Sequence, residues 1–186
     1  MSNKKIGVLV GSLRAGSFSK KIAKVLAGLF PAGYDVEFID ISKLDMYNQD
    51  FDDEDRAPSS YAEFRQKLSE QDAFLFVTPE YNRSVPAVLK NALDVGSRPY
   101  GHNLWGKKAG AVVSVSPGNI SAFGANHHLR QSLVFLDVQT LQQPEAYIAN
   151  VHTLLAEDGS INNPGTLEFF QSIVDAFIAL IEQLAK

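Results

Sequence analysis

Short apolar runs alternate with longer amphipathic segments over most of the chain. Short runs rich in β-branched and aromatic residues are typical of strands that are covered on both faces. The predicted strands are residues 6–10, 34–39, 73–77, 109–115 and 135–140. The predicted helices are residues 17–30, 59–70, 86–96 and 124–134, followed by a last helix that starts at Asn163-Pro164. Strands that alternate with helices in this way predict an α/β fold, with a parallel sheet and helices on both of its faces.

The number of strands narrows the choice of α/β architecture. Five strands in 186 residues fit the flavodoxin-like three-layer sandwich, with parallel strands in the order 2-1-3-4-5, better than the six-strand dinucleotide fold. No internal repeat or linker is visible, so residues 1–186 are predicted to form a single domain. Residues 40–58 are acidic and irregular, and we expect a solvated loop there. Ser60, with Glu63 three residues later, predicts a capping box at the start of the next helix.

Composition excludes several kinds of site. The chain has no cysteine, which excludes disulfides, thiol catalysis and cysteine-ligated metals. A formal net charge of −4 argues against a nucleic-acid partner, which would require a basic face. His127 and His128 are adjacent, so on a helix they point about 100° apart and cannot easily share a metal ion. We therefore expect no metal site.

Export and membrane signals are not expected either. The first apolar run, residues 6–10, is too short to be the core of a secretory signal. No stretch approaches the roughly 20 apolar residues that a membrane-spanning helix needs, so we expect no membrane partner. These observations predict a protein of the cytoplasm.

The loop after the first predicted strand carries groups that suit an anion. It reads Gly11-Ser12-Leu13-Arg14-Ala15-Gly16-Ser17-Phe18-Ser19 and runs into a helix, whose first N–H groups face the loop. Three hydroxyls and a guanidinium add donors for phosphate oxygens. The spacing matches neither the Walker pattern nor Gly-x-Gly-x-x-Gly. Alternatively, Ser17 only caps the helix. Asp40 ends the second strand, where a ribose-binding acid can lie, but the glycines that accompany such an acid are absent.

The loops after the third and fourth predicted strands suit a flat ring. The first of them, residues 78–86, is stiffened by two prolines and offers Tyr81 beside several hydrogen-bonding groups. Taken alone, it could equally be a rigid turn with Tyr81 packed inward. The second, residues 114–124, is rich in small residues that let the backbone approach a ligand.

Parallel strands bring the three loops to one rim of the sheet, because ligands in such folds lie at the carboxyl ends of the strands. Phosphate donors would stand on one side of this rim and a slot for a planar ring on the other. A mononucleotide with a large planar head fits that description. We therefore predict FMN as the bound cofactor.

Four sequence segments together resemble the NADPH-dependent FMN reductase family, and within it the bacterial quinone and chromate reductase branch. The resemblance covers nearly the whole chain. The segments are Gly11-Ser12-Leu13-Arg14-x-Gly16-Ser17, Pro79-Glu80-Tyr81-Asn82-x-Ser84-Val85-Pro86, Leu89-Lys90-Asn91-Ala92-x-Asp94 and Leu129-Arg130-Gln131.

The resemblance implies roles for named residues. Residues of the first loop hold the FMN phosphate: Ser12, Arg14, Ser17 and Ser19, with Gly16 and Phe18 beside them. Residues after the third and fourth strands line the isoalloxazine ring: Pro79, Glu80, Tyr81, Asn82 and Ser116. Relatives usually have Asn at the place of Ser19 and often Trp at that of Val95. Many carry a Gly-Gly pair where Ser121-Ala122 stands.

The resemblance also implies an activity. NADPH or NADH would reduce the flavin, and a quinone, chromate, an azo compound or free flavin would then reoxidise it in a ping-pong reaction. No catalytic side chain is expected, since the redox chemistry belongs to the cofactor. Family members form homodimers or homotetramers, and we expect the same here. Two other functions remain open: a flavodoxin-type electron carrier without NAD(P)H turnover, and a nucleotide-binding regulatory domain.

Overall fold

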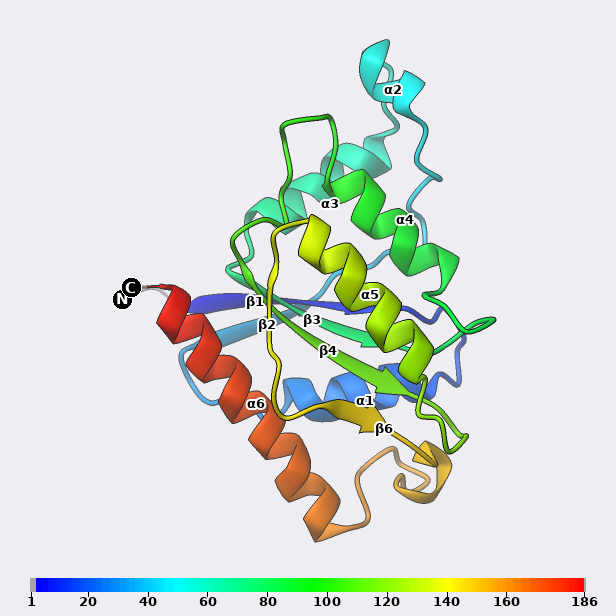
Figure 1. The fold of residues 1–186 in the computed structure, drawn as a ribbon, viewed down its shortest axis with the longest axis vertical. Helices are drawn as coiled ribbons and strands as arrows, with labels where there is room; N and C mark the ends of the chain where they lie inside the picture. Colours follow the sequence, from blue (N-terminus) through cyan, green and yellow to red (C-terminus); the bar gives the residue numbers. More distant parts are fainter. Residues whose placement is uncertain (1–2, 186) are drawn as a thin grey trace.

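The computed structural model describes residues 3–185, and its elements follow the predicted alternation (Figure 1). In chain order they are β1 (Lys4–Val10), α1 (Phe18–Ala27), β2 (Tyr34–Phe38), α2 (Gln49–Asp53), α3 (Ser59–Ser69), β3 (Ala73–Thr78), α4 (Ala87–Gly96), β4 (Ala109–Val115), α5 (Phe123–Phe135), β5 (Gln139–Thr140), β6 (Ala146–Ile148), a 3-10 turn at Val151–Thr153 and α6 (Pro164–Leu184). β3 and β4 are buried along their whole length, as the continuous apolar runs predict.

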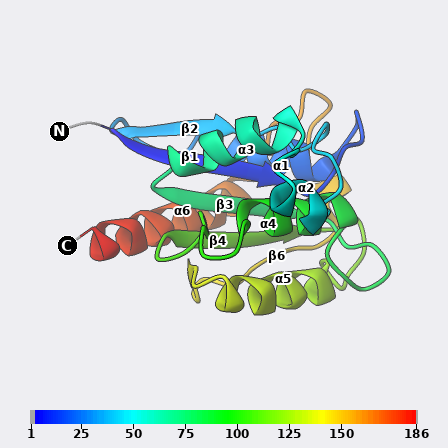
Figure 2. The same cartoon turned by 90° about the horizontal axis from the view of Figure 1, so that it is seen from above.

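The sheet is parallel, and its strands lie in the order β2-β1-β3-β4-β5, with β6 also paired to β4. Figure 2 shows this succession from β2 at one edge to β6 near the other. The predicted flavodoxin-like order is confirmed. The fifth position holds two short strands, β5 beside the start of β4 and β6 beside its end.

The prediction of one strand over residues 135–140 is wrong for most of that range, because these residues close helix α5. Asp137 has a positive φ of 60°. The N–H of Val138 donates to the carbonyl of Leu133, and the N–H of Asp137 donates to that of Val134. This pair of bonds is a Schellman motif, which satisfies the last carbonyls of a helix. Only Gln139–Thr140 remains to pair with β4.

The acidic segment 40–58 is not wholly a solvated loop, since it contains helix α2. Asn48 caps α2 by accepting from the N–H of Asp50 at 3.1 Å. Arg65 of α3 then holds Asp52 with two bonds of 2.7 Å, and the Asp52 side chain is buried. A bidentate arginine–carboxylate pair of this kind anchors the segment to α3.

The predicted capping box at Ser60 does not form. Helix α3 begins after Pro58, which supplies no side-chain cap. The Ser60 hydroxyl instead donates to Asp45 at 2.7 Å. Ser60 therefore ties α3 to the segment that follows β2.

Two apolar cores separate the three layers. α1 and α6 cover one face of the sheet, while α3, α4 and α5 cover the other (Figure 1). The apolar stripe of α6 is buried at Phe170, Val174, Phe177 and Ile181, whereas Leu167 and Leu184 at its two ends are exposed. Trp105 is fully buried in the opposite core and donates its indole N–H to the carbonyl of Leu93.

Helix α6 departs from the expectation that no segment is long and apolar enough to cross a membrane. By length and composition alone, Pro164–Leu184 would suffice. Its buried face, however, packs on the sheet and on α1. A core helix that covers a buried sheet meets the same criterion, so this observation is weak evidence for a membrane span.

Candidate functional site

The carboxyl ends of β1, β3 and β4 meet at one rim of the molecule. In the register of the sheet, Val10 lies beside Val77, and Thr78 lies beside Ser114. The loop after β1 lies close to the end of β3, because the N–H of Gly11, its first residue, donates to the carbonyl of Val77. A Cβ at Gly11 would lie 3.0 Å from the Thr78 hydroxyl, so a glycine permits this close approach.

The three predicted phosphate-binding serines lie at the buried base of the first loop. Ser12, Ser17 and Ser19 are all buried. The Ser17 hydroxyl oxygen accepts from the N–H of Lys20 at 3.2 Å, so Ser17 does cap α1. Its hydroxyl hydrogen remains available to a ligand, since a hydroxyl both accepts and donates. The capping interpretation and the phosphate interpretation are therefore compatible.

The outer part of the first loop is open and positively charged. Arg14 is exposed and forms no ion pair within residues 3–185. Among residues 3–185, no atom lies within 4 Å of where a Cβ of Gly16 would stand. The first turn of α1 contains no acidic side chain, so the N–H groups at the start of the helix face no competing anion. Phe18 packs its ring against the core under α1, so only its backbone is available to a ligand at the rim. This set of donors fits a phosphate group.

The loop after β3 is a tight turn that presents Tyr81 outward. Tyr81 and Ser84 exchange backbone hydrogen bonds of 3.1 and 3.0 Å. Between them Asn82 and Arg83 both have positive φ, 50° and 65°, as in a type I′ turn. The rigid turn is as predicted. Inward packing of Tyr81 is wrong, because half of its surface is exposed (50%).

Glu80 connects this turn to the start of α5, a contact that the sequence did not reveal. Its carboxylate accepts from the N–H of Ala125 at 2.9 Å and from Arg83 at 3.2 Å. A carboxylate at a helix N-terminus is favoured by the helix dipole. A Cβ at Gly124 would lie 2.8 Å from the carbonyl oxygen of Arg83, so glycine is required there. A glycine at the first position of the predicted helix 124–134 was the available signal.

The loop after β4 has strained backbone at two consecutive residues. Ser121 and Ala122 have φ of 59° and 57°. Residues with a Cβ disfavour that conformation, and glycine adopts it without strain. At the start of the same loop, the Ser116 hydroxyl oxygen accepts from the N–H of Gly118 at 3.0 Å. Ser116 is partly exposed at the rim.

A small aromatic cluster borders this loop. His127 lies 2.9 Å from the Tyr147 hydroxyl, which donates to Glu145 at 2.9 Å. Burial raises the pKa of Tyr147, and its hydrogen bond to Glu145 raises it further. The ring of Phe123 lies 4.2 Å from that of His127. Within residues 3–185, no group of three or more His, Asp or Glu side chains is arranged to hold a metal.

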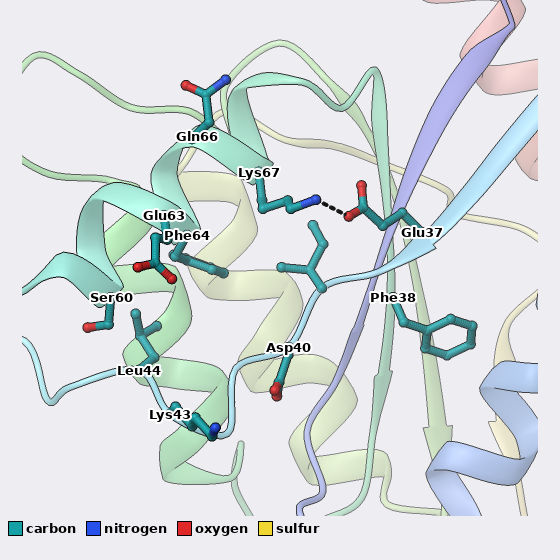
Figure 3. A pocket seen from close by; sticks show the side chains of 11 residues that line it. Glu37, Phe38, Asp40, Lys43, Leu44, Ser60, Glu63, Phe64, Gln66 and Lys67 are labelled. Atoms are coloured by element: carbon teal, nitrogen blue, oxygen red, sulfur yellow. Dashed lines mark hydrogen bonds and ion pairs between the residues drawn. The ribbon is translucent and has the colours of Figure 1, made fainter.

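A cavity of about 510 Å³ lies between β2 and α3 (Figure 3). Leu44 and Phe64 line its apolar part. Lys67 and Glu37 form an ion pair at its edge, and this bond lowers the pKa of Glu37. None of the residues predicted to bind FMN lines this cavity.

The fold and the rim define a class of protein. It is a flavodoxin-like protein whose sheet edge offers hydrogen-bond donors for a phosphate beside a turn with an exposed tyrosine. The family profile described as NADPH-dependent FMN reductase matches residues 4–153. The chain belongs to the NADPH-dependent FMN reductase family. Membership confirms the predicted family and enzyme class, with FMN and NAD(P)H as cofactors.

Similar proteins carry related descriptions. A quinone reductase of Pseudomonas putida is 48% identical over 177 residues, which cover 95% of this chain and 94% of that protein. A 2-hydroxy-1,4-benzoquinone reductase of Burkholderia is 42% identical over 177 residues, which cover 95% of this chain and 96% of that protein. The structure of FerB, a flavoenzyme NAD(P)H:(acceptor) oxidoreductase from Paracoccus denitrificans, matches with a TM-score of 0.90 and 40% identity, covering 97% of this chain and 98% of that one.

Proposed function

We propose that this protein is an FMN-dependent NAD(P)H oxidoreductase whose acceptors are quinones. The observation that carries the proposal is the convergence of a donor-rich loop and an exposed aromatic turn on one rim of the sheet. The names of the relatives that are 48% and 42% identical support quinones as the acceptor class. Chromate, azo compounds and free flavin are further acceptors to be tested.

The first loop holds the FMN phosphate in this proposal. Arg14 contributes the charge, and Ser12, Ser17 and Ser19 donate from the buried base of the loop. Backbone N–H groups at Gly16 and Phe18 complete the cradle at the start of α1. Ser19 keeps one hydroxyl donor where relatives usually have Asn.

The turn after β3 and the loop after β4 hold the isoalloxazine ring. Pro79, Tyr81 and Asn82 shape one side of the slot, and Ser116 borders the other. Glu80 positions the turn instead of binding the ring with its carboxylate. That carboxylate accepts from Ala125 and Arg83 and holds the turn against α5. FMN, when bound, supplies the hydride chemistry at its N5 atom, so no side chain has to act as acid or base. One accessible ring face then serves donor and acceptor in turn, which is the basis of a ping-pong reaction.

Assembly and location are part of the same proposal. Residues 1–186 form one domain, which pairs into a homodimer or homotetramer in the cytoplasm, with no nucleic-acid or membrane partner. Val134 and Phe135 at the end of α5 support self-association, because Phe135 is 83% exposed and large apolar side chains are usually covered. Light scattering coupled to gel filtration measures the assembly: a mass of about one chain contradicts it.

The deciding experiment follows the visible spectrum of FMN on the purified protein. We expect flavin absorbance to bleach under anaerobic conditions when NADPH or NADH is added, and to return when a benzoquinone follows. Parallel lines in initial-velocity plots would support the ping-pong order. Flavin that binds but is not bleached by either donor contradicts the proposal and favours an electron carrier. Failure to bind FMN favours the regulatory domain.

A further inference from the structure

A second hollow adjoins the outer side of the phosphate loop, on the face of the sheet that α1 covers. Its volume is about 420 Å³, within the roughly 300–1,000 Å³ range of small-molecule sites. Side chains of three elements line it: Ser12 and Leu13 of the loop, Lys20 and Lys24 of α1, and Phe38 and Asp40 at the end of β2. The residues proposed to hold the flavin ring follow β3 and β4, so this hollow lies on the opposite side of the phosphate loop.

Phe38 supplies an open aromatic face in this hollow. It lies at the end of the edge strand β2, opposite Val8 of β1, and 45% of its surface is exposed. Figure 3 shows its ring pointing away from Phe64 and Leu44, which line the cavity beneath α3. Phe38 thus borders both spaces, and its ring lies on the side of α1.

Two lysines and one carboxylate give this hollow its charge pattern. Lys20 and Lys24 stand one helical turn apart on α1, so both reach the same side, and neither forms an ion pair within the described chain. Asp40 accepts from the N–H of Ser42 at 2.8 Å. That backbone bond lowers the pKa of Asp40, which keeps the carboxylate ionised at neutral pH.

Lysine stems often cover apolar surface while their ammonium groups stay in water. Covering alone does not account for this arrangement, because Phe38 remains 45% exposed in a hollow that the two lysines and an acidic group also line. An aromatic face, two cations and a carboxylate that accepts hydrogen bonds match the base, the phosphate and the ribose hydroxyls of a nucleotide.

We infer that the hollow beside α1 binds an adenosine phosphate group, with the base on Phe38, the phosphate at Lys20 and Lys24, and a ribose hydroxyl at Asp40. The inference rests on the proposed function, since such a group forms one half of NAD(P)H and one half of FAD. The inference adds a subsite next to the phosphate loop. Binding of FMN alone does not require this subsite.

Calorimetry on the FMN-loaded protein tests the inference, with 5′-AMP and 2′,5′-ADP as probes. We expect both probes to bind and Lys24→Glu to weaken them about fivefold to tenfold, because one attractive charge becomes repulsive. Lys21→Glu is the matched control, with the same charge change on the same helix outside the hollow. No binding, or an equal loss in both variants, would overturn the inference.

Phe38 gives a second readout that does not depend on charge. Phe38→Ala should weaken AMP binding about fivefold or more through lost stacking, and Phe38→Tyr should restore it. Circular dichroism of the variants checks that the edge strand is kept. An unchanged affinity in Phe38→Ala contradicts the placement of the base.

Two further measurements distinguish the source of the group. If it belongs to the donor, Lys24→Glu raises the KM for NADPH while kcat for quinone reduction is unchanged. If it belongs to the flavin, the variant lowers affinity for FAD and leaves that for FMN intact. AMP binding is measured without turnover, so it can succeed where flavin bleaching fails. Failure of the proposed function and failure of the subsite are thus separate results.

Discussion

The loop after β1 and the turn after β3 meet at the same rim but are built in opposite ways. The first loop keeps its charged group free, because Arg14 has no ion-pair partner among residues 3–185 and Gly16 faces open space. The turn after β3 is bound tightly to its surroundings, with Glu80 on the start of α5 and Ser84 within 3.0 Å of His128. One loop offers donors, and the other offers a fixed shape.

This difference follows from what each loop is proposed to bind. A phosphate is recognised by charge and by N–H and O–H donors, which tolerate small displacements of a flexible side chain. A planar ring needs a slot of set width, and its walls must be held by contacts from neighbouring elements. Substitutions should therefore separate the two loops: changes after β1 affect the cofactor, and changes after β3 affect the fold first.

The largest effect is expected for Gly124→Ala at the contact between the turn and α5. The new Cβ would lie 2.8 Å from the Arg83 carbonyl and 2.9 Å from the Glu80 carboxylate. We expect the free energy of unfolding to fall by about 1–3 kcal/mol and FMN affinity to fall with it. Urea unfolding of the apoprotein measures the first effect. Gly16→Ala, whose new Cβ meets no atom of the described residues within 4 Å, is the control and should leave stability unchanged.

Arg14→Ala should weaken FMN about tenfold, because a hydrogen bond to a charged group contributes roughly 1.5–3 kcal/mol. Its urea midpoint should match that of the wild type, since Arg14 is exposed and outside both cores. Fluorescence titration of FMN measures the affinity. Arg56→Ala, an exposed arginine that pairs with Glu54 and lies outside the first loop, is the control. Equal FMN affinity in wild type and Arg14→Ala would remove Arg14 from the phosphate site.

Glu80→Gln tests whether the turn is held by charge at the start of α5. The amide removes the carboxylate that accepts from Ala125, and we expect a loss of about 1 kcal/mol in unfolding free energy. Glu157→Gln, at an exposed loop position, should change stability by less than about 0.5 kcal/mol. If the two variants are equally stable, the bond from Ala125 does not hold the turn.

The smallest effect is expected for Ala122→Gly in the strained loop after β4. Relief of the positive φ at Ala122 should raise the unfolding free energy by about 0.5 kcal/mol, after the greater freedom of glycine in the unfolded chain is subtracted. Ala179→Gly, in an exposed position of α6, should lower it by about 0.5–1 kcal/mol. Thermal unfolding of both proteins measures the difference. The same sign for both substitutions would show that the backbone at Ala122 is not strained.

The fold was predictable to the level of strand order because its signals are local. The buried strands β3 and β4 are continuous apolar runs, and the covering helix α6 has one apolar stripe. The prediction was wrong at residues 135–138, where a Schellman motif depends on the conformation of Asp137. It was also wrong in the acidic segment, where the pairing of Asp52 with Arg65 is a contact between separate elements.

The sequence by itself determined the alternation of strands and helices, the donors after β1 and the family segments, because these are patterns of neighbouring residues. Only the tertiary structure decided that Glu80 holds the start of α5, that Tyr81 faces outward, and that Phe38 stands open beside Lys20 and Lys24. Those features depend on which elements pack together. The local sequence pattern indicates which secondary structure each segment can form. A contact between distant segments depends on where the sheet places them.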